Sequence, residues 1–324
     1  LEYQLDHTAI DDSALVAMLA PLTTLSLLPY ELAPMDGGQI RAELIEAVIR
    51  RAVFSNRQLF ERVVDFWTDH FNIDISDGDF AYLKAVDDRD VIRANAFSTF
   101  PALLSASAHS PAMLRYLDNV LSTRTNPNEN YARELMELHT MGVDGGYSQN
   151  DVVEVARCFT GWTYYGRNNN TNTGTFRYNS NNHDNNQKIV LGNIIPAGGG
   201  LQDGMTVLDI LSDHPSTARF IARKLAIRFL ADSPPASVID DVAATYTATG
   251  GDVKAMLRTI LKPNVLADAA PRYKRPFHIM ASALRTLPVT ITSTNSLRNQ
   301  LSAAGNQPYY WGPPDGYPDT FAHW

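Results

Sequence analysis

The chain of 324 residues is long enough for one large domain or two ordinary ones, and 44% hydrophobic with 19% charged residues is typical of a folded globular protein. A net charge of −8 argues against a surface that binds nucleic acid or an anionic membrane, because either partner would repel it. No apolar run approaches the roughly 18 residues that a transmembrane helix needs.

Two amphipathic helices are predicted near the start of the chain. Ile40, Leu44 and Val48 recur every four residues between residues 38 and 55, which indicates the first helix. The second is predicted over 57–72, with an apolar face that includes Trp67.

Three polar side chains of the second helix need an interpretation. His70 falls within the apolar arc, so a histidine buried in the core is favoured over a half-buried general base. Asp65 and Asp69 lie on the far side of the helix and are expected to be solvated. A little further on, Asp74, Asp77 and Asp79 offer oxygen ligands for calcium, but the spacing and final glutamate of an EF-hand are absent, so no metal site is predicted.

A polar stripe is predicted on the helix that follows Asn126-Pro127 and ends before Gly142. Asn130, Arg133, Glu134 and Glu137 fall at i, i+3, i+4 and i+7, on a different side from Leu135. Glu134 and Glu137 are close enough for one carboxylate to raise the pKa of the other, which would create an acid/base pair. However, a salt bridge from Arg133 to Glu137 explains the same pattern on an ordinary solvated helix face.

The next helix is expected between a capping box at Ser148 and Asp151 and a stop at Gly161. It carries Cys158, the only cysteine, which excludes a disulfide framework and a cysteine-based zinc site. A buried structural thiol is the expected role of Cys158.

The helical pattern is interrupted by an insert rich in asparagine and glycine, over residues 163–204. Two strand-like pieces, 175–178 and 188–191, are expected to pair as a hairpin. Between them lie His183 and Asp184, in a loop where functional side chains are common. In one interpretation either of them acts with partners from the glutamate helix, and in the other Asp184 caps backbone amides in a turn.

Helices are predicted again after the insert, from Pro215 and over 236–249, 252–262, 274–286 and 294–304. Aromatic residues gather on predicted loops, with Trp162 after Gly161, and Tyr309, Tyr310, Trp311 and Tyr317 near the end. They suit stacking against sugar rings, and they equally suit covering the edge of a helical core. The predicted fold is therefore one all-α domain over 1–324, with a β-hairpin insertion around 165–200 and a weaker boundary near 195–205.

Several of these segments carry a family resemblance. The run from Asn128 to Leu138, followed by Gly142, resembles the hallmark of the bacterial domain-of-unknown-function 1800 family. The similarity continues in order through 156–162, 183–192 and 214–225, and it ends at 314–318. The resemblance implies a mostly helical, exported bacterial protein, often encoded beside a sulfatase- or phosphatase-like exported protein. The chain starts at Leu1 and stops at Trp324 inside a family motif, so we expect both ends to be trimmed.

Two functions are open at this stage. In the first, an exported hydrolase uses Glu134 and Glu137 as a carboxylate pair on a polysaccharide or another envelope polymer, and Trp162 or Tyr317 stacks against the substrate. Because two glutamates on one helix flank a scissile bond poorly, Glu129 or Asp184 is an alternative partner. In the second, a non-catalytic exported binding or assembly module works with a partner protein. No cofactor is predicted, because the chain lacks Walker, dinucleotide-binding, G-x-S-x-G and H-E-x-x-H patterns.

Overall fold

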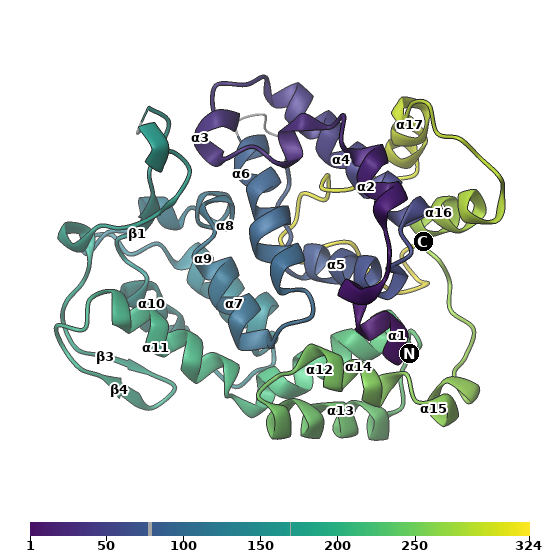
Figure 1. The fold of residues 1–324 in the computed structure, drawn as a ribbon. Helices are drawn as coiled ribbons and strands as arrows, with labels where there is room; N and C mark the ends of the chain where they lie inside the picture. The colour runs from purple at the N-terminus through teal and green to yellow at the C-terminus, as the bar shows by residue number, and fades with distance from the viewer. Residues whose placement is uncertain (77–79, 169) are drawn as a thin grey trace.

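The computed structural model describes residues 1–76, 80–168 and 170–324 and is mainly helical, as predicted (Figure 1). The α-helices of the first half are α1 (Glu2–Leu5), α2 (Ser13–Leu19), α3 (Pro29–Leu32), α4 (Gly37–Phe54), α5 (Gln58–His70), α6 (Ala81–Val86), α7 (Phe100–Ala108), α8 (Pro111–Tyr116), α9 (Glu129–Glu134) and α10 (Gln149–Cys158). Those of the second half are α11 (Leu201–Ser212), α12 (Pro215–Phe229), α13 (Ala236–Thr249), α14 (Val253–Ile260), α15 (Pro263–Ala267), α16 (Pro276–Thr286) and α17 (Asn295–Ala303).

Shorter helical segments connect these elements. Two of them are π-helical, η4 (Asp87–Arg93) after α6 and η6 (Leu135–Thr140) after α9. The others are single 3₁₀ turns, η1 (His7–Ala9), η2 (Thr23–Leu25), η5 (Asn119–Leu121), η7 (Asn170–Asn172) and η8 (Ser180–Asn182). Among the described residues, no helix is both long enough and apolar enough to cross a bilayer.

The predicted start signals place the helices correctly. The Ser148 hydroxyl accepts from the amide of Asp151, and the Asp151 carboxylate accepts from the amide of Ser148, so α10 begins with the expected capping box. Pro215 occupies the first turn of α12, and the His214 ring accepts from the amide of Ser216 at 3.2 Å. The predicted helix over 236–249 has the bounds of α13.

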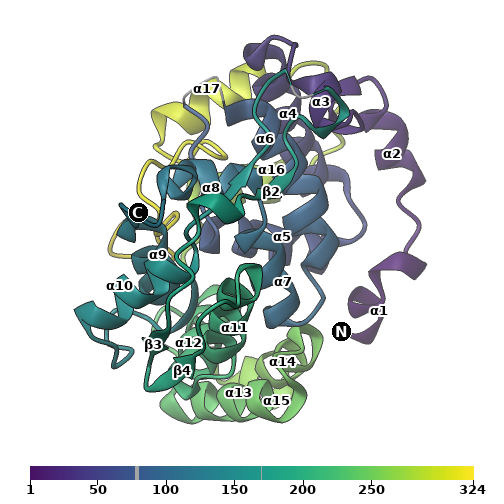
Figure 2. The ribbon, with the colours of Figure 1, turned by 90° about the vertical axis from the view of Figure 1, so that its left-hand side faces the viewer.

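The two predicted strands of the insert correspond to β2 (Phe176–Tyr178) and β3 (Lys188–Val190), but their predicted pairing with each other was wrong, because each pairs with a strand that was not predicted. β2 pairs antiparallel with β1 (Trp162–Tyr164), and β3 pairs with β4 (Asn193–Ile195). Leu191 and Gly192 join β3 to β4 with φ of 49° and 77°, the two left-handed residues that a tight hairpin turn requires. Because this turn has only two residues, β3 pairs with β4, the strand that follows it in the sequence. Figure 2 shows both hairpins on one side of the helical body, with β3 beside α10.

A large apolar core extends from Leu5 to Ile260 and takes residues from most helices, including Trp67, Phe100 and Phe159. A smaller core lies between α4, α16 and α17, where Ile45, Phe277 and Leu301 are buried together with Tyr309. After α17 the chain returns across the body toward α5 (Figure 1), and this C-terminal segment (residues 306–324) contacts Asn72 after α5, Tyr116 of α8 and Arg228 of α12.

Candidate functional site

The predicted polar stripe begins on α9 and continues on η6. The Asn128 side chain accepts from the amide of Asn130 at the helix start, and Gly142 ends the element with a φ of 82°. The helix widens to a π-helix after Glu134, and the Thr140 hydroxyl donates to the carbonyl of Leu135 at 2.6 Å. Such π segments inside helices are frequent at functional sites.

Arg133 joins most of the charged side chains of this stripe. Its Nη2 lies 3.0 Å from Oε2 of Glu129 and 2.9 Å from Oε1 of Gln149, and its Nη1 lies 3.6 Å from Oε1 of Glu137. Asn130 is exposed and donates to the carbonyl of Leu117. The contacts of Arg133 with Glu129 and Glu137 are i,i+4 pairs, and the pair with Glu137 is the salt bridge that the sequence offered as an alternative to a catalytic site.

Glu134 is the exception within the stripe. Among the described residues it makes no hydrogen bond and no ion pair, although its side chain is half-buried. Burial raises the pKa of Glu134, the negative charges of Glu137 and Asp315 raise it further, and Arg133 opposes them. Glu134 is thus a carboxyl group that holds its proton more firmly than an ordinary glutamate.

Asp315 reaches this site from the C-terminal segment. Its side chain is exposed, and Oδ1 accepts from the indole nitrogen of Trp311 at 2.8 Å. The Tyr116 hydroxyl donates to the carbonyl of Gly312 at 2.6 Å, and burial, Asp74, Glu134 and Asp315 all raise its pKa. The charges of Glu134 and Asp315, which belong to two different elements, therefore both act on the hydroxyl of Tyr116.

His183 and Asp184 lie apart from solvent, inside the insert. His183 is 1% exposed, with Nδ1 2.8 Å from the carbonyl of Thr160 and Nε2 3.0 Å from Oδ2 of Asp203. Lys188 is fully buried and ion-paired with Asp203 at 2.5 Å. Buried polar side chains that are paired in this way stabilise a fold. We therefore interpret His183, Lys188 and Asp203 as a structural group that holds the insert in place.

The Asp184 carboxylate accepts from Nε of Arg157 at 2.7 Å and from the amide of Asn186 at 2.9 Å. Burial opposes ionisation of Asp184, but the hydrogen bonds from Arg157 and Asn186 outweigh it and lower the pKa. The bond to the Asn186 amide is the turn cap that was one of the two sequence interpretations.

The two aromatic residues proposed for stacking are both covered. Trp162 is fully buried at the start of β1, against Gly204 and the ring of Phe159, so its ring does not face a substrate at the surface. Tyr317 is 8% exposed, and its hydroxyl donates to the carbonyl of Gln307. In the C-terminal segment, Tyr310 and Phe321 are exposed, at 36% and 66%, and Trp311 is partly exposed.

The sequence prediction that Asp65 and Asp69 are solvated was wrong. Both carboxylates bind the guanidinium of Arg228, whose side chain is 0% exposed, and Nη1 of Arg228 lies 2.6 Å from Oδ2 of Asp65. Arg275 reaches the same two carboxylates, at 3.2 Å from Asp65 and 2.7 Å from Asp69. Asp319 completes the cluster at 2.7 Å from Nε of Arg228. We call these five residues the ionic cluster.

The ionic cluster ties α5 and α12 to the C-terminal segment. Burial would raise the pKa of Asp319, but Arg228 and Arg275 outweigh it and lower the pKa to about 2. Burial would also raise the pKa of Asp65, but His278, Arg275 and Arg228 outweigh it and leave this pKa well below its usual value. Asp65 and Asp319 are therefore ionised at neutral pH. The pKa of Asp69 is shifted the other way, because its burial and the charges of Asp65 and Asp319 outweigh Arg275 and Arg228 and raise it.

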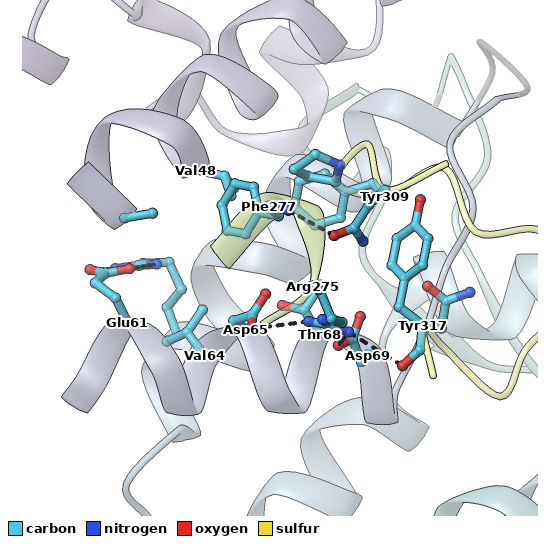
Figure 3. Close-up of a pocket in the computed structure, with 15 residues that line it drawn as sticks. Val48, Glu61, Val64, Asp65, Thr68, Asp69, Arg275, Phe277, Tyr309 and Tyr317 are labelled. Carbon is cyan, nitrogen blue, oxygen red and sulfur yellow. Dashed lines mark hydrogen bonds and ion pairs between the residues drawn. The ribbon is translucent and has the colours of Figure 1, made fainter. Parts of the chain in front are cut away.

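A pocket with about 630 Å³ of empty space, part of it open to solvent, lies against this cluster (Figure 3). Asp65, Thr68 and Asp69 line it from α5, and Arg275 and Phe277 line it from the start of α16. Tyr309 and Tyr317 close it from the C-terminal segment, and the Tyr309 hydroxyl donates to Oδ1 of Asp88 at 2.8 Å. Buried ionisable side chains around a pocket are typical of binding sites.

The remaining sequence interpretations are resolved individually. His70 is 1% exposed among aromatic rings and bonds the carbonyl of His139, which confirms a core histidine. Cys158 is a buried free thiol, as expected. Of the three aspartates considered for calcium, Asp77 and Asp79 lie outside the described residues. Within the described part of the chain, no group of three or more His, Cys, Asp or Glu side chains is placed to bind a metal.

A weak sequence signal pointed to the ionic cluster. Asp65 and Asp69 are spaced i,i+4 on the amphipathic helix α5, and Arg228 follows the buried Leu225 and Ala226 within α12. A charge beside buried apolar residues requires a partner, but the sequence does not show that Arg228 lies about 160 residues away from Asp65 and Asp69.

Comparison with known protein families matches the whole chain, residues 1–324, to the family described as "Protein of unknown function (DUF1800)". The chain belongs to this family, which confirms the resemblance seen in its motifs. No curated protein and no solved structure matches the chain.

Proposed function

We propose that this protein is a hydrolase that works by general acid–base catalysis, with Glu134 as the proton donor. The observation that carries the proposal is the state of Glu134, a half-buried carboxyl that has no ion pair among the described residues and whose pKa is raised by burial, Glu137 and Asp315. Burial and neighbouring carboxylates tune known catalytic acids in the same direction.

Asp315 is the best partner for Glu134. Glu129 is held by Arg133 and Gln149, and Asp184 is held by Arg157, so neither is available. Asp315 is exposed and comes from a different segment, which allows two carboxylates to approach a scissile bond from different sides. In this proposal Glu134 protonates the leaving-group oxygen, and Asp315 or Glu137 activates water or stabilises developing positive charge.

The proposed substrate is a polysaccharide or another polymer of the bacterial envelope, and the proposed location is outside the cytoplasm. Trp311 supports a sugar substrate, because its ring is held beside Asp315 by the indole hydrogen bond and remains partly exposed. Export follows from the family resemblance.

The test is a hydrolysis screen of the purified protein against glycan and ester panels, with Glu134→Gln and Asp315→Asn beside the unchanged chain. We expect each variant to lose roughly a hundredfold or more in turnover, because a positioned acid or base contributes typically 10²–10⁴-fold. The control is Glu2→Gln, which removes an exposed carboxylate whose partner is Arg258. Turnover that survives Glu134→Gln unchanged would remove Glu134 from the mechanism.

A second candidate is a non-catalytic exported module that binds a glycan or a partner protein of the sulfatase or phosphatase type. Arg133 favours it, because its ion pairs with Glu129 and Glu137 and its hydrogen bond to Gln149 are contacts that an ordinary solvated helix face makes. The two candidates differ in the stability of Glu134→Gln. A catalytic glutamate without partners is replaced at little cost, whereas a paired structural carboxylate would cost several kcal/mol.

A further inference from the structure

A second hollow adjoins the pocket of Figure 3 and shares Asp65, Arg275 and Phe277 with it. It contains about 1000 Å³ of empty space, part of it open to solvent, between α5, α16 and the residues that precede α16. We call it the basic hollow because of the side chains that line it.

The charge of the basic hollow is opposite to that of the protein. Its charged lining has two carboxylates, Glu61 and Asp65, and six cationic groups, which are Arg62, Arg228, Arg272, Lys274, Arg275 and Arg285. The lining therefore carries 6 − 2 = 4 excess positive charges in a chain with a net charge of −8. Some of these cations are neutralised by carboxylates from outside the hollow.

Three of the six cationic side chains are neutralised by carboxylates: Arg228, Arg272 and Arg275. Arg228 and Arg275 bind the carboxylates of the ionic cluster, and Arg272 lies 3.4 Å from Asp232 and 3.3 Å from Asp319. These guanidiniums are explained by folding, because each buried charge has a partner.

Arg62, Lys274 and Arg285 are not neutralised in this way. Arg62 has one contact with a carboxylate, at 3.5 Å from Oδ2 of Asp65, and that oxygen already accepts from Arg228 at 2.6 Å and from His278 at 2.9 Å. Lys274 is exposed and donates to the Ser282 hydroxyl at 2.8 Å. Arg285 donates to backbone carbonyls alone among the described residues.

Arg62 is half-buried, with 34% of its side chain exposed, and it shares its carboxylate partner Asp65 with Arg228 and Arg275. Burial lowers the pKa of Arg62 to about 10; Asp65 opposes the shift, whereas Arg228 and Arg275 add to it by repulsion. A guanidinium in this state gains most from an added anion, which it can bind with two parallel hydrogen bonds.

We infer that the basic hollow binds an oxyanion, a carboxylate, sulfate or phosphate group carried by a small molecule or a polymer, and that Arg62 and Lys274 are its main contacts. The site is separate from Glu134, so its test does not depend on the hydrolase proposal.

The experiment is a titration of the purified chain with sodium sulfate, sodium phosphate and sodium malonate, followed by calorimetry at constant ionic strength in a chloride buffer. We expect saturable binding of at least one of the three anions. A preference for sulfate and phosphate identifies a tetrahedral group, and a preference for malonate identifies a carboxylate; either result supports the inference.

The variants Arg62→Gln and Lys274→Gln assign the binding to the hollow. We expect the dissociation constant to rise roughly tenfold or more for each, because charge-assisted hydrogen bonds are about twice as strong as neutral ones. Lys274→Gln serves as the second variant because Lys274 is exposed and its removal does not disturb the core.

Arg115→Gln is the matched control. Arg115 has the same i,i+3 contact with an aspartate, 3.7 Å from Asp118, and a similar side-chain exposure of 41% against 34% for Arg62, but it does not line the hollow. Absence of saturable binding by all three anions would overturn the inference, and so would equal weakening by Arg62→Gln and Arg115→Gln.

Discussion

Replacement of Arg228 by methionine tests whether the ionic cluster holds the C-terminal segment on the helical body. Methionine keeps much of the length and apolar volume of the side chain but removes the guanidinium. The change leaves three carboxylates around a site where the arginine side chain is 0% exposed.

The expected loss follows from the partners that remain. Asp65 keeps Arg275 and His278, whereas Asp319 keeps Arg272 at 3.3 Å and Arg275 at 3.9 Å in place of a 2.7 Å bond. Removing one partner of a buried ion pair typically costs about 3–5 kcal/mol, because the remaining charge stays buried. This loss is a large fraction of a typical unfolding free energy of about 5–15 kcal/mol.

The assay is equilibrium unfolding in urea, followed by far-UV circular dichroism, with Arg115→Gln as the control. Arg115 forms a long, exposed contact with Asp118, so we expect its loss to cost about 1 kcal/mol or less. A loss below about 1 kcal/mol for Arg228→Met would refute the claim that the cluster stabilises the fold, since a buried pair that is broken costs more.

Three further changes test other parts of the structure. We expect Asp203→Asn to lower the unfolding free energy by about 3 kcal/mol or more in the same assay, because Lys188 would remain buried without its carboxylate. The pKa of Asp319 is lowered to about 2, because nearby guanidiniums outweigh its burial. Its stabilisation is therefore complete above the unfolded-state pKa of about 4 and is lost as the pH falls to about 2, so the unfolding free energy of Asp319→Asn should depend less on pH across this window. Gly316 has a φ of 76° and leaves no room for a Cβ against a backbone carbonyl of α5, whereas Gly250, with a φ of 62°, faces open space. We expect Gly316→Ala to cost more than Gly250→Ala, which should cost about 1–2 kcal/mol, and equal losses in urea unfolding would contradict the packing described here.

The helices were predictable because their signals are local. Such signals act within one or two helical turns. The capping box at Ser148 and the proline at 215 mark the starts of α10 and α12, and the glycine pair after residue 249 marks the end of α13. The strand pairing was missed because the tight turn at Leu191 and Gly192 needs a leucine with positive φ, which is an uncommon conformation for that residue.

The candidate site was predictable in part. The stripe from Asn130 to Glu137 was located from spacing alone, but the switch to a π-helix at Leu135 and the approach of Asp315 depend on tertiary packing. The prediction that Asp65 and Asp69 are solvated also failed because their environment depends on tertiary packing. Their partners Arg228 and Arg275 are about 160 and 210 residues away in the sequence.

The protonation of Glu134 is the central claim, and it can be measured without a known substrate. Carbon-13 labelling of the glutamate side chains allows the carboxyl of Glu134 to be titrated by NMR, and the Glu134→Gln variant assigns the signal. The structure predicts a pKa above the ordinary glutamate value, and a downward shift in Glu137→Gln because one repelling charge is removed. A pKa at or below the ordinary value that does not respond to Glu137→Gln would contradict the assignment of Glu134 as the acid.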